Sequence, residues 1–391
     1  MLRYFTSGES HGEALVAFLS GIPAGLKIDQ AFLDRELWRR QQGYGRGGRM
    51  KIERDTAHIL SGVRHGITIG SPISVWLENR DWKNWQESLP VGEGDPAKHK
   101  AVKSPRPGHA DLAGALKYNF PEARYILERA SARESAARVA VGAIAKLFLK
   151  QLGIEVLSHV IAVGAANLAE VEVPWETIVP LSQRDEILLT CADPATEQKM
   201  KEEVDKALRT GDSVGGIFEV VAHGVPPGLG TYAQWDERLD GLLAGAVMSL
   251  QAVKAVEIGV GVTAAVSPGS SVHDEIGYGA KSGFTGFSRR SNHAGGVEGG
   301  ISNGEEIRVR GYLKPISTLR RPLQSVDFAT REPVKAAYER SDVCVVPAAG
   351  VAGEAMVALT LARCALDKFG GDSMGETLHN YLGYCQQIKN Y

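Results

Sequence analysis

The chain has 391 residues, of which 43% are hydrophobic and 23% are charged, and these fractions match those of folded globular proteins. They exclude a disordered, collagen-like or coiled-coil chain. Because 44 Lys and Arg residues face 46 Asp and Glu residues, the formal charge of −2 leaves no global basic field that would attract nucleic acid or an anionic membrane.

Hydrophobic spacing and turn residues predict the secondary structure. In chain order we expect a helix over 30–42, a long loop over 91–111, a helix over 124–152, a strand over 154–164, a helix over 195–209, a strand over 215–225, a helix over 236–256, a long loop over 265–305, a strand over 306–315 and a helix over 351–369. The strands do not alternate regularly with helices, which favours an α+β layered fold over a doubly wound sheet. The small residues of Glu128–Leu152 predict a helix packed on several sides at the centre.

The organisation of the chain favours one domain over 1–391. Two halves, roughly 1–150 and 210–391, are hypothesised to be loosely related. The four cysteines are widely spaced and match no zinc or redox pattern. The N-terminus MLRYFTSGESHGE lacks the parts of a secretory signal, and no apolar run reaches the roughly 18 to 20 residues that a membrane span needs. We therefore expect a cytoplasmic enzyme or binding module.

The densest polar feature is Arg39–Asp55, RRQQGYGRGGRMKIERD. Between residues 35 and 54 seven basic residues oppose two glutamates, a local charge of +5. Its glycines match GxGxxG, but a helical segment precedes them and a strand-like segment follows, the reverse of the dinucleotide-binding order. Arginine donates to phosphate and carboxylate in pairs of bonds, so a polyanionic small ligand is one hypothesis and a solvated basic loop is the other.

Two histidines lie in glycine-bracketed loops, His11 in SGESHGE and His109 in SPRPGHAD. An imidazole near arginines can act as a general acid or as the cationic partner of an anion, whereas a single histidine is often structural. In ERASARESAARVA, helical spacing places Arg129 and Arg133 on one face, where salt bridges to Glu128 and Glu134 are the alternative interpretation.

Three later segments also carry polar groups: Gly286–Glu305, Lys314–Pro322 and Glu339–Cys344. The first is a backbone-rich loop able to contact a planar cofactor or a phosphate, and the others are polar loops or helix-capping residues in their simplest interpretation. No HExxH, GxSxG or P-loop motif occurs, which disfavours metal-dependent and covalent mechanisms.

Several long motifs, in order from the first residues to about residue 345, resemble the chorismate synthase family. They are GESHGEALVAFLSGIPAG, RRQQGYGRGGRMKIERD, RPGHADLAGALKY, ERASARESAARVA, GDSVGGIFEVVAHGVPPGLG, SLQAVKAVEIG, SNHAGGVEGGISNGE and KPIST. The resemblance implies a 1,4-elimination of phosphate from 5-enolpyruvylshikimate 3-phosphate that gives chorismate, the last step of the shikimate pathway. It also implies a requirement for reduced FMN, which is taken to lend and recover electron density without net redox change.

The resemblance also implies roles for individual residues. His11 matches the histidine that protonates the departing phosphate, and His109 matches the one that sits near the reduced flavin and stabilises its anionic form by proton donation. Asp342 matches the acid that helps the flavin N5 accept the substrate proton. The anion-binding arginines are Arg40, Arg46, Arg49, Arg106 and Arg133, of which Arg40 and Arg46 are also linked to NADPH. The flavin contacts are Arg129, Ala130, Ser131, Gln251, Ala252, Gly299, Lys314, Pro315, Ile316, Ser317, Thr318 and Arg340.

The resemblance further implies a β-α-β sandwich, in which antiparallel sheets enclose central long helices, and a homotetramer. The C-terminal motif departs from the family's RHDPC and VPRA, since Ser341, Val343 and Ala348 replace His, Pro and Arg. This departure concerns the geometry near the flavin. Two alternatives remain at this point: a non-catalytic phosphate or nucleic-acid binder, and a flavin reductase.

Overall fold

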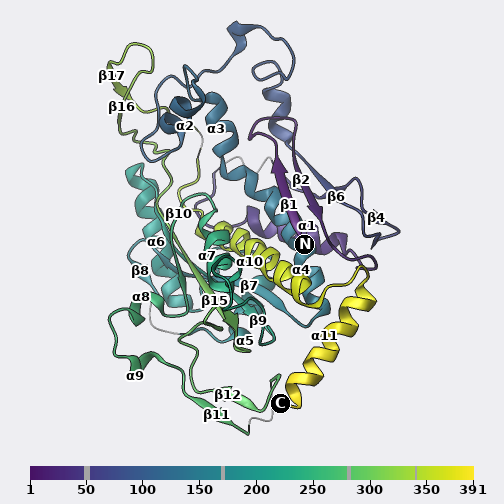
Figure 1. Cartoon of the computed structure of the whole chain (residues 1–391). Helices are drawn as coiled ribbons and strands as arrows, with labels where there is room; N and C mark the ends of the chain where they lie inside the picture. The colour runs from purple at the N-terminus through teal and green to yellow at the C-terminus, as the bar shows by residue number, and fades with distance from the viewer. Residues whose placement is uncertain (48–52, 169–171, 280–282, 340) are drawn as a thin grey trace.

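The computed structural model describes residues 1–391 except 48–52, 169–171, 280–282 and 340. Two antiparallel sheets lie on either side of a layer of long helices (Figure 1). The first sheet has the order β1 (Arg3–Ser7), β2 (Ala14–Ser20), β6 (Ile73–Glu78) and β3 (His58–Ile59). The second has the order β10 (Val253–Ile258), β15 (Ile307–Leu313), β9 (Gly216–His223), β7 (Glu155–Val163) and β8 (Ala166–Asn167). The expected α+β sandwich is confirmed.

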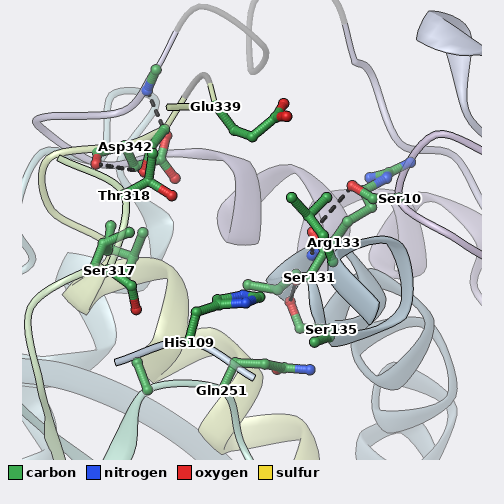
Figure 2. A pocket seen from close by; sticks show the side chains of 18 of the residues that line it. Ser10, His109, Ser131, Arg133, Ser135, Gln251, Ser317, Thr318, Glu339 and Asp342 are labelled. Carbon is green, nitrogen blue, oxygen red and sulfur yellow. Dashed lines mark hydrogen bonds between the residues drawn. The ribbon is translucent and has the colours of Figure 1, made fainter. Parts of the chain in front are cut away.

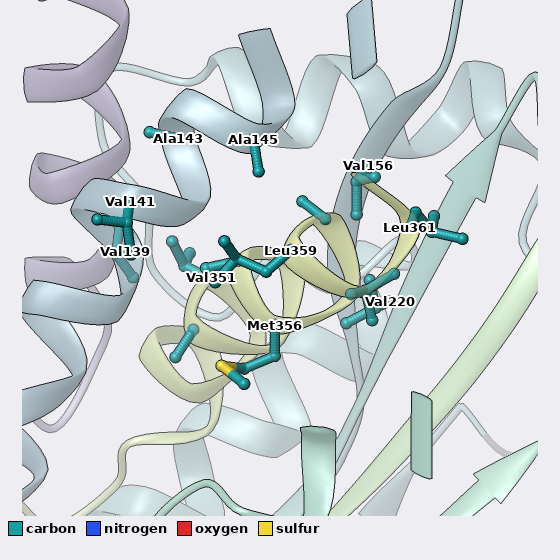
Figure 3. Packing of buried hydrophobic residues seen from close by; sticks show 14 of the residues in the cluster. Val139, Val141, Ala143, Ala145, Val156, Val220, Val351, Met356, Leu359 and Leu361 are labelled. Atoms are coloured by element: carbon teal, nitrogen blue, oxygen red, sulfur yellow. The ribbon is translucent and has the colours of Figure 1, made fainter. Parts of the chain in front are cut away.

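The central layer contains α4 (Ser135–Gln151) and α10 (Val346–Phe369). Helix α4 packs against the first sheet, and α10 packs against β7 and β9 of the second (Figure 3). The two helices approach so closely that a Cβ on Gly142 would lie 2.3 Å from the Cβ of Ala355. Alanine- and glycine-rich sequence therefore serves helix packing here, and the predicted central helix is confirmed over residues 135–151.

Helix α10 also corrects the expectation that no segment is apolar enough to span a membrane. It is long and apolar enough by length and composition, but 83% of its most apolar window is buried inside the protein. A core helix enclosed by other elements passes the same test, because its whole circumference needs apolar side chains.

The first sheet was not predicted. In β2 the side chains of Leu15, Ala17 and Leu19 are fully buried and alternate with partly exposed residues, as a half-buried strand requires. Its neighbour β1 pairs with it in register from Arg3 opposite Ser20 to Ser7 opposite Val16. The hairpin between them, residues 8–13, carries His11 toward the helical layer.

The remaining helices flank this core. They are α1 (Gln30–Gln41), α2 (Asp111–Tyr118), α3 (Arg124–Ala130), α5 (Trp175–Gln183), α6 (Pro194–Thr210), α7 (Leu239–Met248), α8 (Gly261–Ala264), α9 (Gly269–Val272) and α11 (Met374–Lys389). Helix α6 was predicted well because residues at both of its ends mark its bounds. Asp193 caps its first turn, and Gly211, with φ of 74°, ends it.

Two helix predictions need correction. The predicted helix over 124–152 is interrupted at Ser131, whose side chain accepts a hydrogen bond from the Arg133 amide and starts a short 3-10 turn. The predicted helix over 236–256 ends at Met248, and Val253–Ile258 form β10 instead, because β-branched residues there pair with β15.

Short hairpins account for much of the rest. They pair β4 (Val63–Arg64) with β5 (Ile67–Thr68), β11 (Ile276–Tyr278) with β12 (Phe287–Arg289), β13 (Val297–Glu298) with β14 (Ile301–Ser302), and β16 (Gln324–Val326) with β17 (Pro333–Lys335). The predicted loop over 265–305 therefore contains two hairpins, which corrects that expectation. The loop over 91–111 holds only a 3-10 turn, Pro96–Lys98, before α2 begins at its last residue.

Candidate active site

A cavity of about 650 Å³ opens where the β1–β2 hairpin, the end of α1, the start of α4 and the start of α10 meet. Figure 2 shows Ser10, Ser131 and Arg133 on one side and Ser317, Thr318 and Asp342 on the other, with His109 between them. These segments are far apart in sequence, so the cavity exists only in the folded chain.

Most of the predicted site residues line this cavity. They are His11, Arg40, Arg46, Arg106, His109, Ala130, Ser131, Arg133, Gln251, Ala252, Lys314, Ile316, Ser317, Thr318 and Asp342. Arg129, Pro315 and Gly299 are not in its lining. Arg49 and Arg340 fall outside the described residues.

The break in the predicted 124–152 helix separates Arg129 from Arg133. The Arg129 side chain donates to the Thr6 and Gly8 carbonyl oxygens instead of facing the cavity. Gly299 lies in the turn between β13 and β14, where its φ of 59° suits glycine. The prediction that Arg129 and Arg133 share one helical face is therefore wrong.

Two cavity arginines share one carboxylate. Arg133 donates to both oxygens of Asp55 at 2.6 and 2.7 Å, and Arg40 donates to Oδ2 at 2.7 Å. All three side chains are buried. Burial and the nearby charge of Arg133 lower the pKa of Arg40 to about 10, although Asp55 opposes the shift. The alternative in which Arg133 pairs with Glu128 or Glu134 is also wrong, because Asp55 is its close partner.

Arg133 also lies 4.0 Å from the buried Glu53, so two carboxylates neighbour the two guanidinium groups, and Asp55 is the nearest one to both. Arg40 is only 4% exposed and lines the cavity, so it does not belong to a solvated loop. The geometry thus favours the polyanionic ligand over the solvated basic loop for Arg40.

His11 is held by contacts from two directions. Its Nδ1 lies 2.9 Å from Glu128 Oε1, and its ring stacks on Trp85 with centroids 4.0 Å apart. Burial alone would raise the pKa of Glu128, but hydrogen bonds from His11 and the charge of Arg124 hold it below its ordinary value. Glu128 is therefore an anion at neutral pH.

His109 belongs to a second such network. Its Nδ1 lies 2.5 Å from Asp111 Oδ1, while Arg106 donates to both oxygens of the same carboxylate at 2.8 and 3.0 Å. Arg106 also donates to Thr318 Oγ1 at 2.8 Å. Asp111 begins α2, and despite its burial the bonds from His109 and Arg106 hold its pKa well below the usual range.

Asp342 is fixed by the glycine-rich segment. Its Oδ1 accepts from the Gly47 amide at 2.5 Å, and Oδ2 lies 3.4 Å from Arg46 Nη1. A Cβ on Gly47 would lie 3.0 Å from the Ser341 carbonyl oxygen, so glycine permits this close approach. The divergent RSDVC motif therefore keeps Asp342 in the lining.

The other two replaced positions also have defined places. The Val343 amide donates to the Gly45 carbonyl oxygen at 2.8 Å, a bond that proline could not make. Ala348 lines the cavity at the start of α10, beside Val345, Ala349 and Ala352. This stretch of the wall is apolar.

The strand ends add further polar groups. Lys314 Nζ donates to Ser317 Oγ at 3.0 Å, and that hydroxyl donates to the Gly108 carbonyl oxygen. Burial, Lys254 and Arg106 lower the pKa of Lys314. Ala252, with a left-handed φ of 70°, accepts from the Lys314 amide and lines the cavity.

The sequence did not identify the side chains that hold the site residues in place. They are Asp55, Asp111, Trp85, and Glu128 as the hydrogen-bond partner of His11. Asp111 was detectable, because it follows His109 by two residues at a predicted loop end. No local signal connects Asp55 with Arg133, or Trp85 with His11, because those contacts form only between distant segments.

Comparison with known proteins places this geometry in context. Residues 2–366 match the family model described as chorismate synthase. Proteins named chorismate synthase from Koribacter versatilis and Acidobacterium capsulatum are 76% and 68% identical to the chain, with full coverage of both chains in each case. A crystal structure of chorismate synthase superposes with a TM-score of 0.78 at 40% identity, covering 100% of this chain and 99% of that one.

Proposed function

The chain belongs to the chorismate synthase family, and we propose that its cavity is where phosphate is removed from 5-enolpyruvylshikimate 3-phosphate. Family membership makes it a carbon-oxygen lyase of the shikimate pathway with a small-molecule substrate and a reduced-flavin requirement. The observation that carries the proposal is the convergence of Arg40, Arg46, Arg106 and Arg133 with two carboxylate-paired histidines in one cavity of a slightly acidic chain.

The substrate carries one phosphate and two carboxylates, which match this arginine set. Arg40 and Arg133 line the cavity with Asp55 as their common nearest carboxylate, so their positive charge attracts an anion of the substrate. Arg106 is preorganised by Asp111 and Thr318. Fixed donors bind without the entropy cost of ordering long side chains, which favours orientation of the reacting ring.

The residues present also fit a flavin. Ala252, Val345 and Ala349 offer apolar surface to a planar ring, while Ser131, Lys314 and Thr318 offer donors to its phosphate and polar edge. When bound, reduced FMN supplies electron density to the allylic system as phosphate departs and recovers it as the proton leaves.

Three residues move or hold protons in this proposal. The C–O bond to phosphate breaks, a ring C–H bond loses its proton, and a new double bond forms. His11 gives its proton to the departing phosphate through Nε2, because Nδ1 is bound to Glu128. His109, whose Nδ1 contacts Asp111, would donate a proton toward a bound flavin, and Asp342, held by Gly47, would assist the transfer of the ring proton to that flavin.

Further parts of the proposal extend beyond the cavity. We propose that residues 1–391 act as one domain, that four copies form a homotetramer, and that the enzyme works in the cytoplasm without nucleic acid or membrane partners. NADPH, bound through Arg40 and Arg46, is proposed as a reductant for the flavin.

An anaerobic assay tests the function. Purified protein receives 5-enolpyruvylshikimate 3-phosphate and chemically reduced FMN, and chorismate and phosphate are followed together. Equal amounts of both products are expected, and His11→Ala or His109→Ala should lower turnover about 10²-fold with the fold intact.

Chorismate formed from oxidised FMN plus NADPH would support intrinsic flavin reduction.

The same assay separates the alternatives. NADPH-driven FMN reduction without any chorismate would favour the flavin reductase. FMN binding without either activity, by protein with an unchanged circular dichroism spectrum, would favour the non-catalytic binder and contradict the proposal.

A further inference from the structure

The His11 ring is restrained in two perpendicular ways. Glu128 Oε1 lies in reach of Nδ1 at 2.9 Å, and Glu128 Oε2 accepts the His11 amide at 2.7 Å, so one carboxylate binds both backbone and ring. The Trp85 indole stacks on the ring face at an interplanar angle of 27°. The side chains of His11 and Glu128 are 13% and 2% exposed.

We propose that Glu128 and Trp85 are positioning residues that fix the orientation and tautomer of His11. The inference rests on the proposed role of His11 as the acid for the departing phosphate. A carboxylate that accepts from Nδ1 leaves Nε2 as the only ring nitrogen able to exchange a proton with a ligand in the cavity.

The neighbouring charges support an anionic Glu128 that is not neutralised. Arg124 lies 3.3 Å from Glu128 Oε1, but it also donates to Glu339 at 2.8 Å and so divides its charge between two carboxylates. On the indole side, Lys100 Nζ and the Arg124 guanidinium lie 4.0 and 5.1 Å from the Trp85 centroid, and Trp85 Nε1 donates to Asp81. Both carboxylates and both cations therefore lie around the pair.

Trp85 contributes a flat, buried surface. Its indole is only 8% exposed and is anchored by the hydrogen bond to Asp81. A ring stacked on it cannot rotate about its Cβ–Cγ bond without losing the contact, so the stack preserves the direction of Nε2. A smaller side chain would admit water beside the Nδ1–Glu128 bond and weaken it.

The chain contains a matched control outside the cavity. His223 stacks on Trp175 with centroids 4.9 Å apart, and its Nδ1 lies 2.9 Å from Glu306 Oε1. The contacts are therefore the same in kind. The His223 side chain is 46% exposed, however, and none of the three residues lines the cavity.

A fluorescence titration tests the proposal without substrate or flavin. Protonated imidazole stacked on an indole quenches its emission, so subtracting the titration of Trp85→Phe from that of the intact protein isolates the Trp85 signal. We expect one step that disappears in His11→Asn. In Glu128→Gln the Trp85 emission should shift to longer wavelength and the step should lose most of its amplitude, because the ring is no longer held against the indole and water enters. In Glu306→Gln both should stay unchanged.

Kinetics give a second readout. In Glu128→Gln, kcat should fall about tenfold or more with little change in KM, because a ring that is no longer aligned transfers its proton less readily. Trp85→Ala should lower kcat about tenfold or more through misalignment of the ring, while Trp85→Phe should lose less.

The outcomes separate this proposal from the proposed function. A fluorescence step that Glu128→Gln leaves at full amplitude, in protein with an unchanged circular dichroism spectrum, overturns the role of Glu128. Trp85→Ala with an unchanged kcat overturns the role of Trp85. The expected fluorescence shift in a protein that makes no chorismate would contradict only the function.

Discussion

Arg39 and Arg40 are consecutive residues on α1, yet they enter two different charge networks. Arg39 donates to Glu354 through two bonds of 2.7 Å and to Glu36 at 2.8 Å, and Lys146 contacts the same two carboxylates. Two cations thus meet two anions inside the core. Arg40 instead shares Asp55 with Arg133, whose guanidinium also lies 4.0 Å from the buried Glu53, so at the cavity wall two cations have the same nearest carboxylate.

This difference separates a network that supports the fold from one that is prepared for a ligand. Burial alone would lower the pKa of Arg39, but Glu354 and Glu36 raise it above its ordinary value. The pKa of Arg40 is lowered to about 10 by burial and by Arg133. Arg40 and Arg133 line the cavity and the core network does not, so an anion bound in the cavity would add a partner to the second network only.

The largest expected effect comes from unbalancing the core. Glu354→Gln would leave Arg39 and Lys146 with one carboxylate in a buried site, so the free energy of unfolding should fall by about 3–5 kcal/mol. Urea unfolding measures it. Asp367→Asn, which removes a half-exposed partner of Arg363 on the same helix, should cost less than about 1 kcal/mol. Equal losses in the two variants would contradict the comparison.

Low pH should weaken the same core network. Arg39 and Lys146 lower the pKa of Glu36 to about 2, although burial opposes them. Since this value lies below the ordinary 4.5, the stabilisation is complete above about pH 4.5 and is lost as the pH falls toward 2. We therefore expect the unfolding free energy to decline over that range, with a smaller slope in Glu36→Gln. Parallel curves for the two proteins would exclude this role of Glu36.

At the cavity wall the expected effect is on binding. Arg40→Ala removes a buried guanidinium, but Asp55 keeps Arg133 as a partner, so the free energy of unfolding should fall by less than in Glu354→Gln. The KM for the phosphate-bearing substrate should rise roughly 10- to 100-fold, because a charge-assisted bond is lost. Arg35→Ala removes the same charge from the same helix at a half-buried position outside the cavity lining, where the guanidinium stacks on Trp38 and donates to the Arg184 carbonyl oxygen. If both variants shifted KM alike, Arg40 would act only through the overall charge.

The contrast between Arg39 and Arg40 also shows which features local sequence signals can predict. Helices such as α6 and α10 carry their periodicity and end signals locally, so they were predicted to within a few residues. Most cavity residues were found because the motifs around them are long. Nothing local distinguishes Arg39 from Arg40, since both belong to the same basic run. Their opposite roles depend on which face of α1 meets α10 and which meets Asp55.

The errors have the same origin. Ser131 interrupts a helical pattern because its side chain caps the next turn, and this single event turns Arg129 away from the cavity and Arg133 toward it. The segment after Met248 reads as helix until pairing with β15 makes it a strand. In both cases a tertiary or side-chain contact overrides the local preference.

The smallest expected effect concerns backbone strain at the cavity edge. Ala252 holds a left-handed φ of 70°, which costs an alanine roughly 1 kcal/mol and costs glycine little. Ala252→Gly should therefore stabilise the protein by up to about 1 kcal/mol in thermal or urea unfolding. Ala358→Gly, in the buried interior of α10, should do the opposite by about the same amount or more, because glycine is a poor helix former. If both variants lost stability, the edge of the cavity would be as tightly packed as the core, and the contrast between the two regions would rest on charge alone.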